Sequence, residues 1–297
     1  MALEKAAQEG DLLLVKKLIK NASQETKNSA LLESCANGSL AIVKLLIKNK
    51  ADIQKTYASQ KTLLHVASEN GHFEIVKFLI ENQADINKTD YFNRTPLYIA
   101  SKNGNFEIMK LLIENGANIN TENYYNRNPL YEAIHGKNLQ IVKYLIENGA
   151  SVNKLNNFKV TPLFIASCCG SLEIVKYLVE NGANINNADC FNRTPVYMAT
   201  NIGYLEIVKY LIQKNETATP KVNLFYLSCS QKHKEIATFL LILDPMLPID
   251  IERGKVSDLS VVKFYHNNFV NFVFMQKQNM FNALKSKRMT NCLFKFK

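Results

Sequence analysis

Residues 94–120 read RTPLYIASKNGNFEIMKLLIENGANIN, and closely similar stretches follow at 127–153 (RNPLYEAIHGKNLQIVKYLIENGASVN) and at 160–186 (VTPLFIASCCGSLEIVKYLVENGANIN). Successive copies start 33 residues apart. A fixed period of about 20–50 residues predicts a stack of similar supersecondary units, each of which contacts only its neighbours. We therefore expect a repeat architecture whose function lies on the surface of the stack.

The repeat extends beyond these three copies. The position of Thr95 recurs in steps of 33 residues and then once after a step of 29, giving the series Ser29, Thr62, Thr95, Asn128, Thr161, Thr194 and Asn223. Degenerate copies are expected at the ends of a stack, where one face has no neighbour. We accordingly divide the chain into a degenerate N-terminal capping repeat (1–28), six repeats (29–222), a degenerate repeat (223–248) and a basic, aromatic C-terminal cap or tail (249–297).

Each copy should begin with a short helix. Thr95 can accept a hydrogen bond from the first free backbone amides, and Pro96 loses nothing at the first helical position. A helix is therefore predicted over about 96–103. Gly104 suits the left-handed position that ends it.

A second helix is predicted over about 106–115, with Asn105 as its cap and Gly116 at its end. The Asn-rich stretch 117–127 has no helical period and indicates an extended loop or hairpin. Apolar residues at helical spacing are expected to face the core: Ile108, Leu111 and Leu112.

The pattern TPLxxAxxxGxxxIVKxLIExGAxIN resembles the ankyrin repeat over roughly residues 1–245. The resemblance implies an all-α solenoid of helix-turn-helix units with projecting hairpin loops, in about 7–8 copies plus a helical C-terminal cap. The family's histidine in TPLH is kept only at His65 and is replaced by Tyr98, Tyr131, Phe164 and Tyr197. The family's hairpin glycine is replaced by Asn93, Asn126, Lys159 and Asn192. Asparagine adopts a left-handed turn at low cost, so the turn at Lys159 is the one that departs most from the family.

The formal net charge of +10 is unevenly distributed. Residues 259–297 contain seven Lys or Arg and no acidic residue, which leaves a net charge of +3 for residues 1–258. This balance argues against reading the repeats as a nucleic-acid binder, because the basic footprint is confined to the tail. No apolar run reaches the length of a membrane span, and the N-terminus lacks an apolar signal segment. We expect a cytoplasmic or nuclear monomer.

No catalytic constellation is present in the sequence. The five histidines lie at unrelated repeat positions, and the nucleotide-binding, serine-hydrolase, zinc-protease and paired CxxC motifs are missing. His65 is interpreted as a buried residue that stabilises a turn. The six cysteines lack metal-ligand spacing and are expected to be reduced thiols. The expectation is a protein that is not an enzyme and uses no cofactor, metal or small-molecule substrate.

The hairpin tips carry the strongest functional signal. They read DYFNR (90–94), NYYNR (123–127), NNFKV (156–160) and DCFNR (189–193). The family resemblance implies that the second, third and fifth residues face partners: Tyr91, Phe92, Arg94, Tyr124, Tyr125, Arg127, Asn157, Phe158, Val160, Cys190, Phe191 and Arg193. Aromatic residues and arginine dominate protein interfaces. The alternative is that these rings only pack between neighbouring hairpins and stiffen the stack.

By repeat register, first-helix residues should line the same side: Ile99, Lys102, Asn103, Glu132, His135, Cys168, Cys169, Met198, Asn201 and Ile202. Four loop asparagines recur at Asn87, Asn120, Asn153 and Asn186. They are interpreted as turn formers; the resemblance also allows asparaginyl hydroxylation at these positions.

The sequence thus predicts a non-catalytic protein–protein interaction module, acting as a scaffold, adaptor or inhibitor. One alternative is a substrate adaptor of a larger machine such as a ubiquitin ligase. Another is a membrane-surface or nucleic-acid-associated regulator that uses the basic tail, where the apolar stripe from Val262 to Met280 suggests a helix. Capping the end of the stack is the preferred role for that tail.

Overall fold

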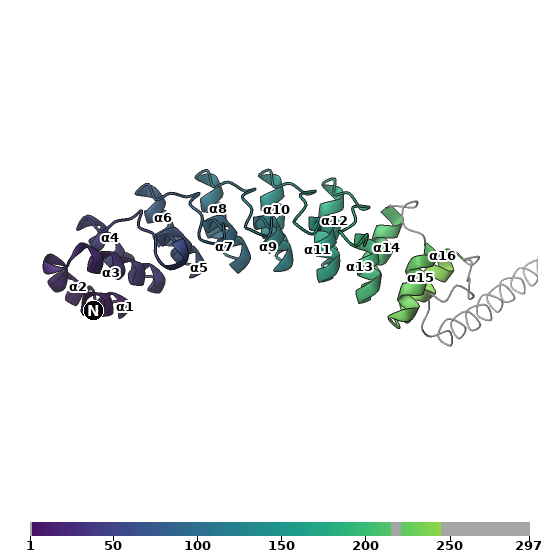
Figure 1. The fold of residues 1–297 in the computed structure, drawn as a ribbon, viewed down its shortest axis with the longest axis horizontal. Helices are drawn as coiled ribbons and strands as arrows, with labels where there is room; N and C mark the ends of the chain where they lie inside the picture. Colours follow the sequence, from purple (N-terminus) through teal and green to yellow (C-terminus); the bar gives the residue numbers. More distant parts are fainter. Residues whose placement is uncertain (1, 215–220, 245–297) are drawn as a thin grey trace, which may run out of the picture. The chain divides into compact units, whose positions relative to one another are not determined.

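The computed structural model describes residues 2–214 and 221–244. The predicted cap or tail at 249–297, with its helix from Val262 to Met280, lies outside the described residues. The chain forms two compact units, Met1–Asn192 and Arg193–Lys297. Every regular element in the described ranges is helical (Figure 1). The expected all-α repeat fold is therefore confirmed.

Helices come in pairs along the chain (Figure 1). The first unit contains α1 (Ala2–Gln8), α2 (Leu12–Leu18), α3 (Gln24–Asn37), α4 (Leu40–Lys48), α5 (Leu63–Glu69), α6 (Phe73–Glu81), α7 (Pro96–Asn103), α8 (Phe106–Glu114), α9 (Pro129–His135), α10 (Leu139–Glu147), α11 (Pro162–Cys169) and α12 (Leu172–Glu180), with short 3₁₀ turns at Ile19–Asn21 and Ala58–Gln60. The described part of the second unit contains α13 (Pro195–Ile202), α14 (Leu205–Lys214), α15 (Lys221–Ser230) and α16 (Lys234–Leu243). These described helices make eight pairs, in agreement with the expected seven to eight copies.

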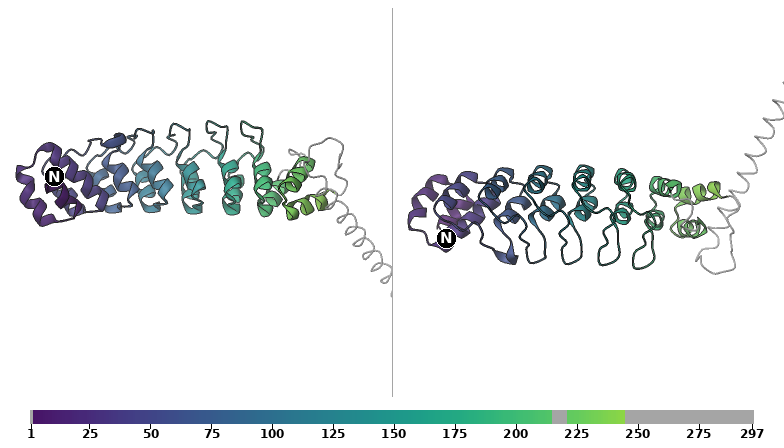
Figure 2. Two further views of the ribbon diagram at one scale, coloured as in Figure 1. Left: turned by 60° about the horizontal axis from the view of Figure 1, so that its bottom comes forward. Right: turned by 90° about the horizontal axis from the view of Figure 1, so that it is seen from above.

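The first unit consists of two layers of helices. The first helix of each pair packs against the first helix of the next, from α1 and α3 through to α9 and α11, and the second helices form a parallel series from α2 to α12. Figure 2 shows that the long loops after α6, α8, α10 and α12 project on one side of these layers. Successive copies therefore present their loops along one edge.

One apolar position anchors every copy from the second onward. The residue two places after the Thr95 position is almost fully buried throughout: Leu31, Leu64, Leu97, Leu130, Leu163, Val196 and Phe225. Each of these side chains lies on the first helix of its pair. Removing such apolar area from water supplies the main stabilising free energy of the stack, at about 25 cal/mol per Å².

The local helix signals act largely as predicted. The hydroxyl of Thr95 accepts from the amide of Tyr98, and the helix begins at Pro96. Gly104 adopts a left-handed φ of 76°. The second helix begins at Phe106, but the capping prediction for Asn105 is wrong.

The side chain of Asn105 instead donates to the backbone oxygen of Ser68, at 2.9 Å, on the preceding copy. The inter-repeat bond satisfies an end carbonyl of α5, so it competes successfully with local capping. One of the three core positions predicted for the second helix is wrong. Met109 is buried with Ile108 and Leu112, whereas Leu111 is only half-buried.

Two of the expected repeat boundaries fall inside helices. The boundary at 28/29 lies within α3, which begins at Gln24 after a cap by Ser23. The boundary at 222/223 lies within α15, which begins at Lys221. The first helices of these two copies thus begin before the residue at the Thr95 position.

The loop asparagines join consecutive copies. The amide of Asn87 donates to the backbone oxygen of Gly116, and its oxygen accepts from the backbone amide of Asn118. Asn120 and Asn153 repeat the same pair of bonds one copy further along. Their role extends beyond the turn formation predicted from sequence.

Among the described helices, none combines the length and the apolar character needed to cross a bilayer.

Candidate functional site

The first residue of each loop tip holds the tip together. Asp90 accepts hydrogen bonds from the backbone amides of Phe92 and Arg94, both at 2.9 Å. Asn123 and Asn156 accept the two equivalent amides in the next copies. These residues are buried. They were not among the site residues predicted from the sequence. The signal that could have found them is the Asp or Asn that begins each five-residue tip sequence.

The fourth residue of each tip turns the chain in the left-handed region. The φ angles are 58° at Asn93, 53° at Asn126, 57° at Lys159 and 59° at Asn192. Lys159 keeps the geometry of its asparagine counterparts because Asn156 holds both tip amides in place. The substitution does not alter the turn.

The tip aromatics are exposed, as the family resemblance implied. Exposed fractions lie between 45% and 70% for Tyr91, Phe92, Tyr124, Tyr125, Phe158 and Phe191. We call Phe92, Tyr125, Phe158 and Phe191 the aromatic row. Of the other predicted tip residues, Asn157 and Cys190 are exposed, while Arg94, Arg127, Val160 and Arg193 are half-buried.

Three of the four tips donate a backbone hydrogen bond to the preceding loop, and the fourth donates from the Asn157 side chain to the backbone oxygen of Tyr124. The amide of Tyr91 donates to the oxygen of Ser59 at 2.8 Å, that of Tyr124 to Phe92 at 3.3 Å, and that of Cys190 to Phe158 at 3.0 Å. The main chain therefore orders the loop edge. The rings of the row are left largely in solvent.

The predicted lining by first-helix residues requires correction. Ile99 is only 3% exposed and Glu132 only 8%, although both were expected on the surface. Their shared repeat position faces the packed interior, where Ile165 is also buried. Met198, at the same position, is half-buried. Of the remaining predicted residues, Lys102, Asn103, His135 and Ile202 are exposed and Cys168, Cys169 and Asn201 are half-buried.

A pocket of about 450 Å³ lies between the copies that begin at Thr95 and Asn128. Two members of the aromatic row, Phe92 and Tyr125, belong to its wall. Within it the hydroxyl of Tyr98 donates to a carboxylate oxygen of Glu132 at 2.6 Å. This hydrogen bond offsets part of the free-energy cost of burying the Glu132 carboxylate. The remaining lining residues are Arg94, Lys102, Asn123, Arg127, His135 and Gly136.

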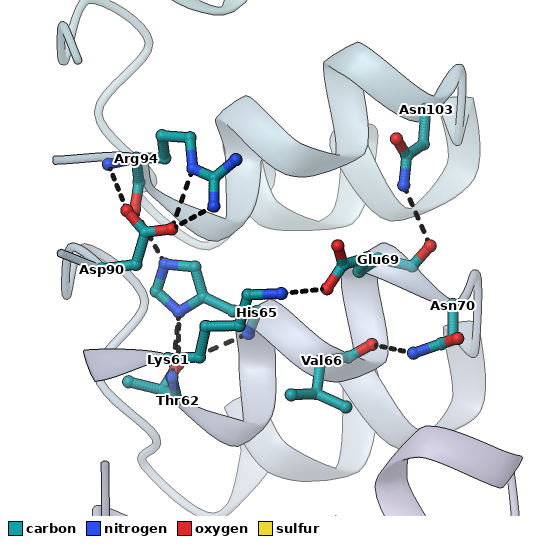
Figure 3. A network of polar contacts seen from close by, with 9 residues as sticks. All are labelled: Lys61, Thr62, His65, Val66, Glu69, Asn70, Asp90, Arg94 and Asn103. Atoms are coloured by element: carbon teal, nitrogen blue, oxygen red, sulfur yellow. Dashed lines mark hydrogen bonds and ion pairs between the residues drawn. The ribbon is translucent and has the colours of Figure 1, made fainter. Parts of the chain in front are cut away.

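His65 is fully buried and bridges two copies (Figure 3). The amide of Thr62 donates to its Nδ1 at 3.2 Å, so Nε2 carries the proton and donates to the backbone oxygen of Arg94 at 2.8 Å. Burial lowers the pKa of His65. A neutral imidazole fixed at both nitrogens stabilises the turn, as predicted.

Acid is expected to destabilise the junction around His65. The folded protein resists protonation of this residue, whereas the unfolded chain takes up the proton near pH 6.5. The stability that neutral His65 contributes is therefore present above about pH 6.5 and lost as the pH falls below it. Urea unfolding between about pH 7 and pH 5 should show this loss, and His65→Tyr, which places a tyrosine where the next copy has Tyr98, should lack that component. An identical pH dependence in both proteins contradicts the assignment.

The histidines are not all at unrelated positions, contrary to the expectation. His72 and His233 both directly precede the second helix of a pair. Each places Nε2 within hydrogen-bonding distance of a backbone oxygen of the preceding copy, Ala36 at 2.9 Å and Asn201 at 3.0 Å. The shortened step before Asn223 obscures this shared position in the sequence.

In the described part of the chain, metal-ligating side chains and reactive thiols provide little support for a catalytic site. No group of three or more His, Cys, Asp or Glu side chains is arranged to hold a metal ion there. Burial raises the pKa of the thiols of Cys35 and Cys169, and raises that of Cys229 to about 11. These thiols stay protonated near neutral pH and are poor nucleophiles. Cys292 and His266 lie outside the described residues.

A family model described as ankyrin repeats (3 copies) matches residues 3–90, 88–156 and 163–252. No curated protein matches the chain significantly. The matched stretches span both units and most of the described helices.

Proposed function

Because this chain belongs to the ankyrin repeat family, we propose that it binds another protein along the aromatic row at its loop edge. Ankyrin repeats are in general protein–protein interaction modules, and the family is typically non-enzymatic. Scaffold, adaptor and inhibitor are all roles that such binding can serve. All three roles require a surface that binds another protein, and the aromatic row is the surface proposed.

The observation that carries the proposal is the exposure of the aromatic row. Large rings on a surface are unfavourable in water unless a partner covers them, and aromatic residues are enriched at interface hot spots. The row repeats along consecutive loops, so an extended partner could contact several rings at once. Backbone hydrogen bonds, and between the second and third tips a bond from the Asn157 side chain to the backbone oxygen of Tyr124, already join the tips, so stiffening of the stack does not require the rings.

Arginine side chains support two of the rings. The guanidinium carbon of Arg94 lies 4.9 Å from the ring centre of Phe92, and that of Arg127 lies 5.7 Å from Tyr125. Such cation–π contacts restrict the rings before binding. A partner then loses less side-chain entropy when it packs against them, which favours affinity.

Phe158→Ala and Tyr125→Ala are each expected to weaken partner binding by about 2 kcal/mol, because each removes an exposed anchor. Folding stability should change by no more than about 0.5 kcal/mol, as is usual for surface substitutions. The partner is first captured from the native lysate with the intact chain. Dissociation constants and melting temperatures are then measured for each variant.

Leu13→Ala is the matched control, since Leu13 is 71% exposed but lies on α2, away from the aromatic row. It should leave affinity unchanged. If Phe158→Ala and Tyr125→Ala lower the melting temperature strongly while affinity holds, the rings are structural and the binding surface lies elsewhere.

A further inference from the structure

Two arginines at the same repeat position have different electrostatic surroundings. Arg94 donates through Nε and Nη2 to a carboxylate oxygen of Asp90, at 2.8 and 2.7 Å (Figure 3). The residue equivalent to Asp90 in the next copy is Asn123, which is neutral. Arg127 consequently forms no ion pair with any residue that the structure describes. The charge of Arg94 is therefore neutralised within its own copy, whereas the charge of Arg127 is not.

Arg127 is nevertheless held in a defined place. Its guanidinium carbon lies 4.7 Å from the ring centre of Tyr131 and 5.7 Å from that of Tyr125. Its Nε atom is buried and has no hydrogen-bond partner within the described ranges. A desolvated donor without an acceptor costs free energy, and an incoming acceptor would recover it. The geometry thus presents a pre-positioned cation.

The pocket that contains Arg127 is positively charged. Besides Arg127, the cationic side chains of its wall are Lys102, which is exposed, and Arg94, which is already paired with Asp90. Among the described residues that line it, the only acidic one is Glu132, which is occupied by the Tyr98 hydroxyl. The pocket therefore complements a negatively charged group that arrives beside the rings of Phe92 and Tyr125.

We propose that this pocket binds a carboxylate side chain of an acidic peptide segment in the partner, with Arg127 as its main ligand. The planar guanidinium can donate two parallel hydrogen bonds to a carboxylate. The inference rests on the proposed function, because the same segment would run across the aromatic row. Binding would then require a negative charge in the partner segment in addition to its contact with the aromatic row.

Two other occupants are disfavoured by charge. Residues 249–297 of this chain carry nine Lys or Arg against three acidic residues, so their net positive charge opposes entry into a positively charged pocket. A second copy of the chain carries the same net charge of +10, which opposes self-association. An acidic segment of another protein is the occupant that fits.

A displayed library of random peptides, selected on the full chain, tests the inference. Selected sequences should be enriched in Asp or Glu at one position close to apolar or aromatic residues. A synthetic peptide of the selected sequence should bind Arg127→Gln about tenfold or more weakly, because a charge-assisted pair is lost. Lys110→Gln, which removes an equal charge from α8 in the other layer, should bind as the unaltered chain does.

Asn123→Asp provides a second, independent variant. It copies Asp90 into the next repeat and should engage Arg127 internally, so affinity for the acidic peptide should also fall. Circular dichroism must show that the variant is folded. Unchanged affinity in both folded Arg127→Gln and folded Asn123→Asp overturns the inference.

Peptide substitutions separate the possible ligands. Glutamine at the selected acidic position should bind about tenfold or more weakly than glutamate. Tighter binding of phosphoserine there would assign the pocket to phosphopeptides and overturn the carboxylate assignment. Selection without acidic enrichment, combined with loss of binding in Phe158→Ala, would refute the pocket but leave the proposed function standing. Binding insensitive to Phe158→Ala would count against the proposed function itself.

Discussion

Leu97→Ala is expected to lower the free energy of unfolding by about 3–5 kcal/mol, because it opens a cavity in a fully buried position. Leu97 lies on α7, which packs between α5 and α9. The surrounding first helices are fixed by their own buried side chains and can collapse only partly onto the cavity. The effect should therefore lie near the upper end of the usual range.

The position of Leu97 within the stack should determine where the damage spreads. A repeat stack is stabilised by the units themselves and by the interfaces between neighbours. Weakening a central unit loosens two interfaces at once. Hydrogen exchange should consequently accelerate across α5 to α9 and remain slower further along the first unit.

Leu31→Ala is the matched control because Leu31 occupies the same buried position in α3. It removes the same atoms nearer the end of the stack, so faster exchange should be confined mainly to α1–α6. In the unaltered chain, terminal copies should already exchange faster than central ones. Equal acceleration of exchange in all helices, from either substitution, would contradict nearest-neighbour stabilisation.

The helical repeat could be read from the sequence because each signal was local. Threonine, proline and glycine at fixed offsets defined α7 from Pro96 to Asn103, and the structure has the same bounds. The burial of Ile108 and Leu112 followed from helical spacing, although that of Leu111 was wrongly predicted. Exposure of the tip aromatics followed from the family resemblance, and the tips do project away from the helices (Figure 2).

What the sequence could not give depended on contacts between copies. Asn105 looked like a helix cap, but its amide reaches a carbonyl of the preceding copy. Ile99 and Glu132 were placed on the surface, and both are buried because the neighbouring first helix covers that position. Interactions across 30 or more residues leave little trace in a single copy.

The difference between Arg94 and Arg127 shows the same limit at the candidate site. The sequence contains both DYFNR and NYYNR, so the change from Asp90 to Asn123 is visible. The consequence of this change cannot be read from the sequence, because nothing in the five-residue tip shows that its first residue is buried and contacts the fifth. The structure supplies that geometry and shows that, among the described residues, Arg94 forms an ion pair with Asp90 whereas Arg127 forms none.

Asp90→Ala is expected to destabilise the first unit by about 3–5 kcal/mol, because it breaks a buried charge pair from one side. The Asp90 side chain is fully buried and accepts from the amides of Phe92 and Arg94 and from the Arg94 guanidinium. Alanine leaves all of these donors without their acceptor. The loop tip should open, and Arg94 would no longer present its backbone oxygen firmly to His65.

Asp90→Asn separates the two contributions of the carboxylate. An asparagine oxygen can still accept both tip amides, as Asn123 and Asn156 do in their own copies. Only the pair with Arg94 is lost, and that side chain retains 20% exposure through which water can solvate it. The cost should therefore fall to about 1–2 kcal/mol. Urea unfolding of both variants, followed by circular dichroism, measures the difference; equal losses of stability would mean that the ion pair, and not the held turn, dominates this position.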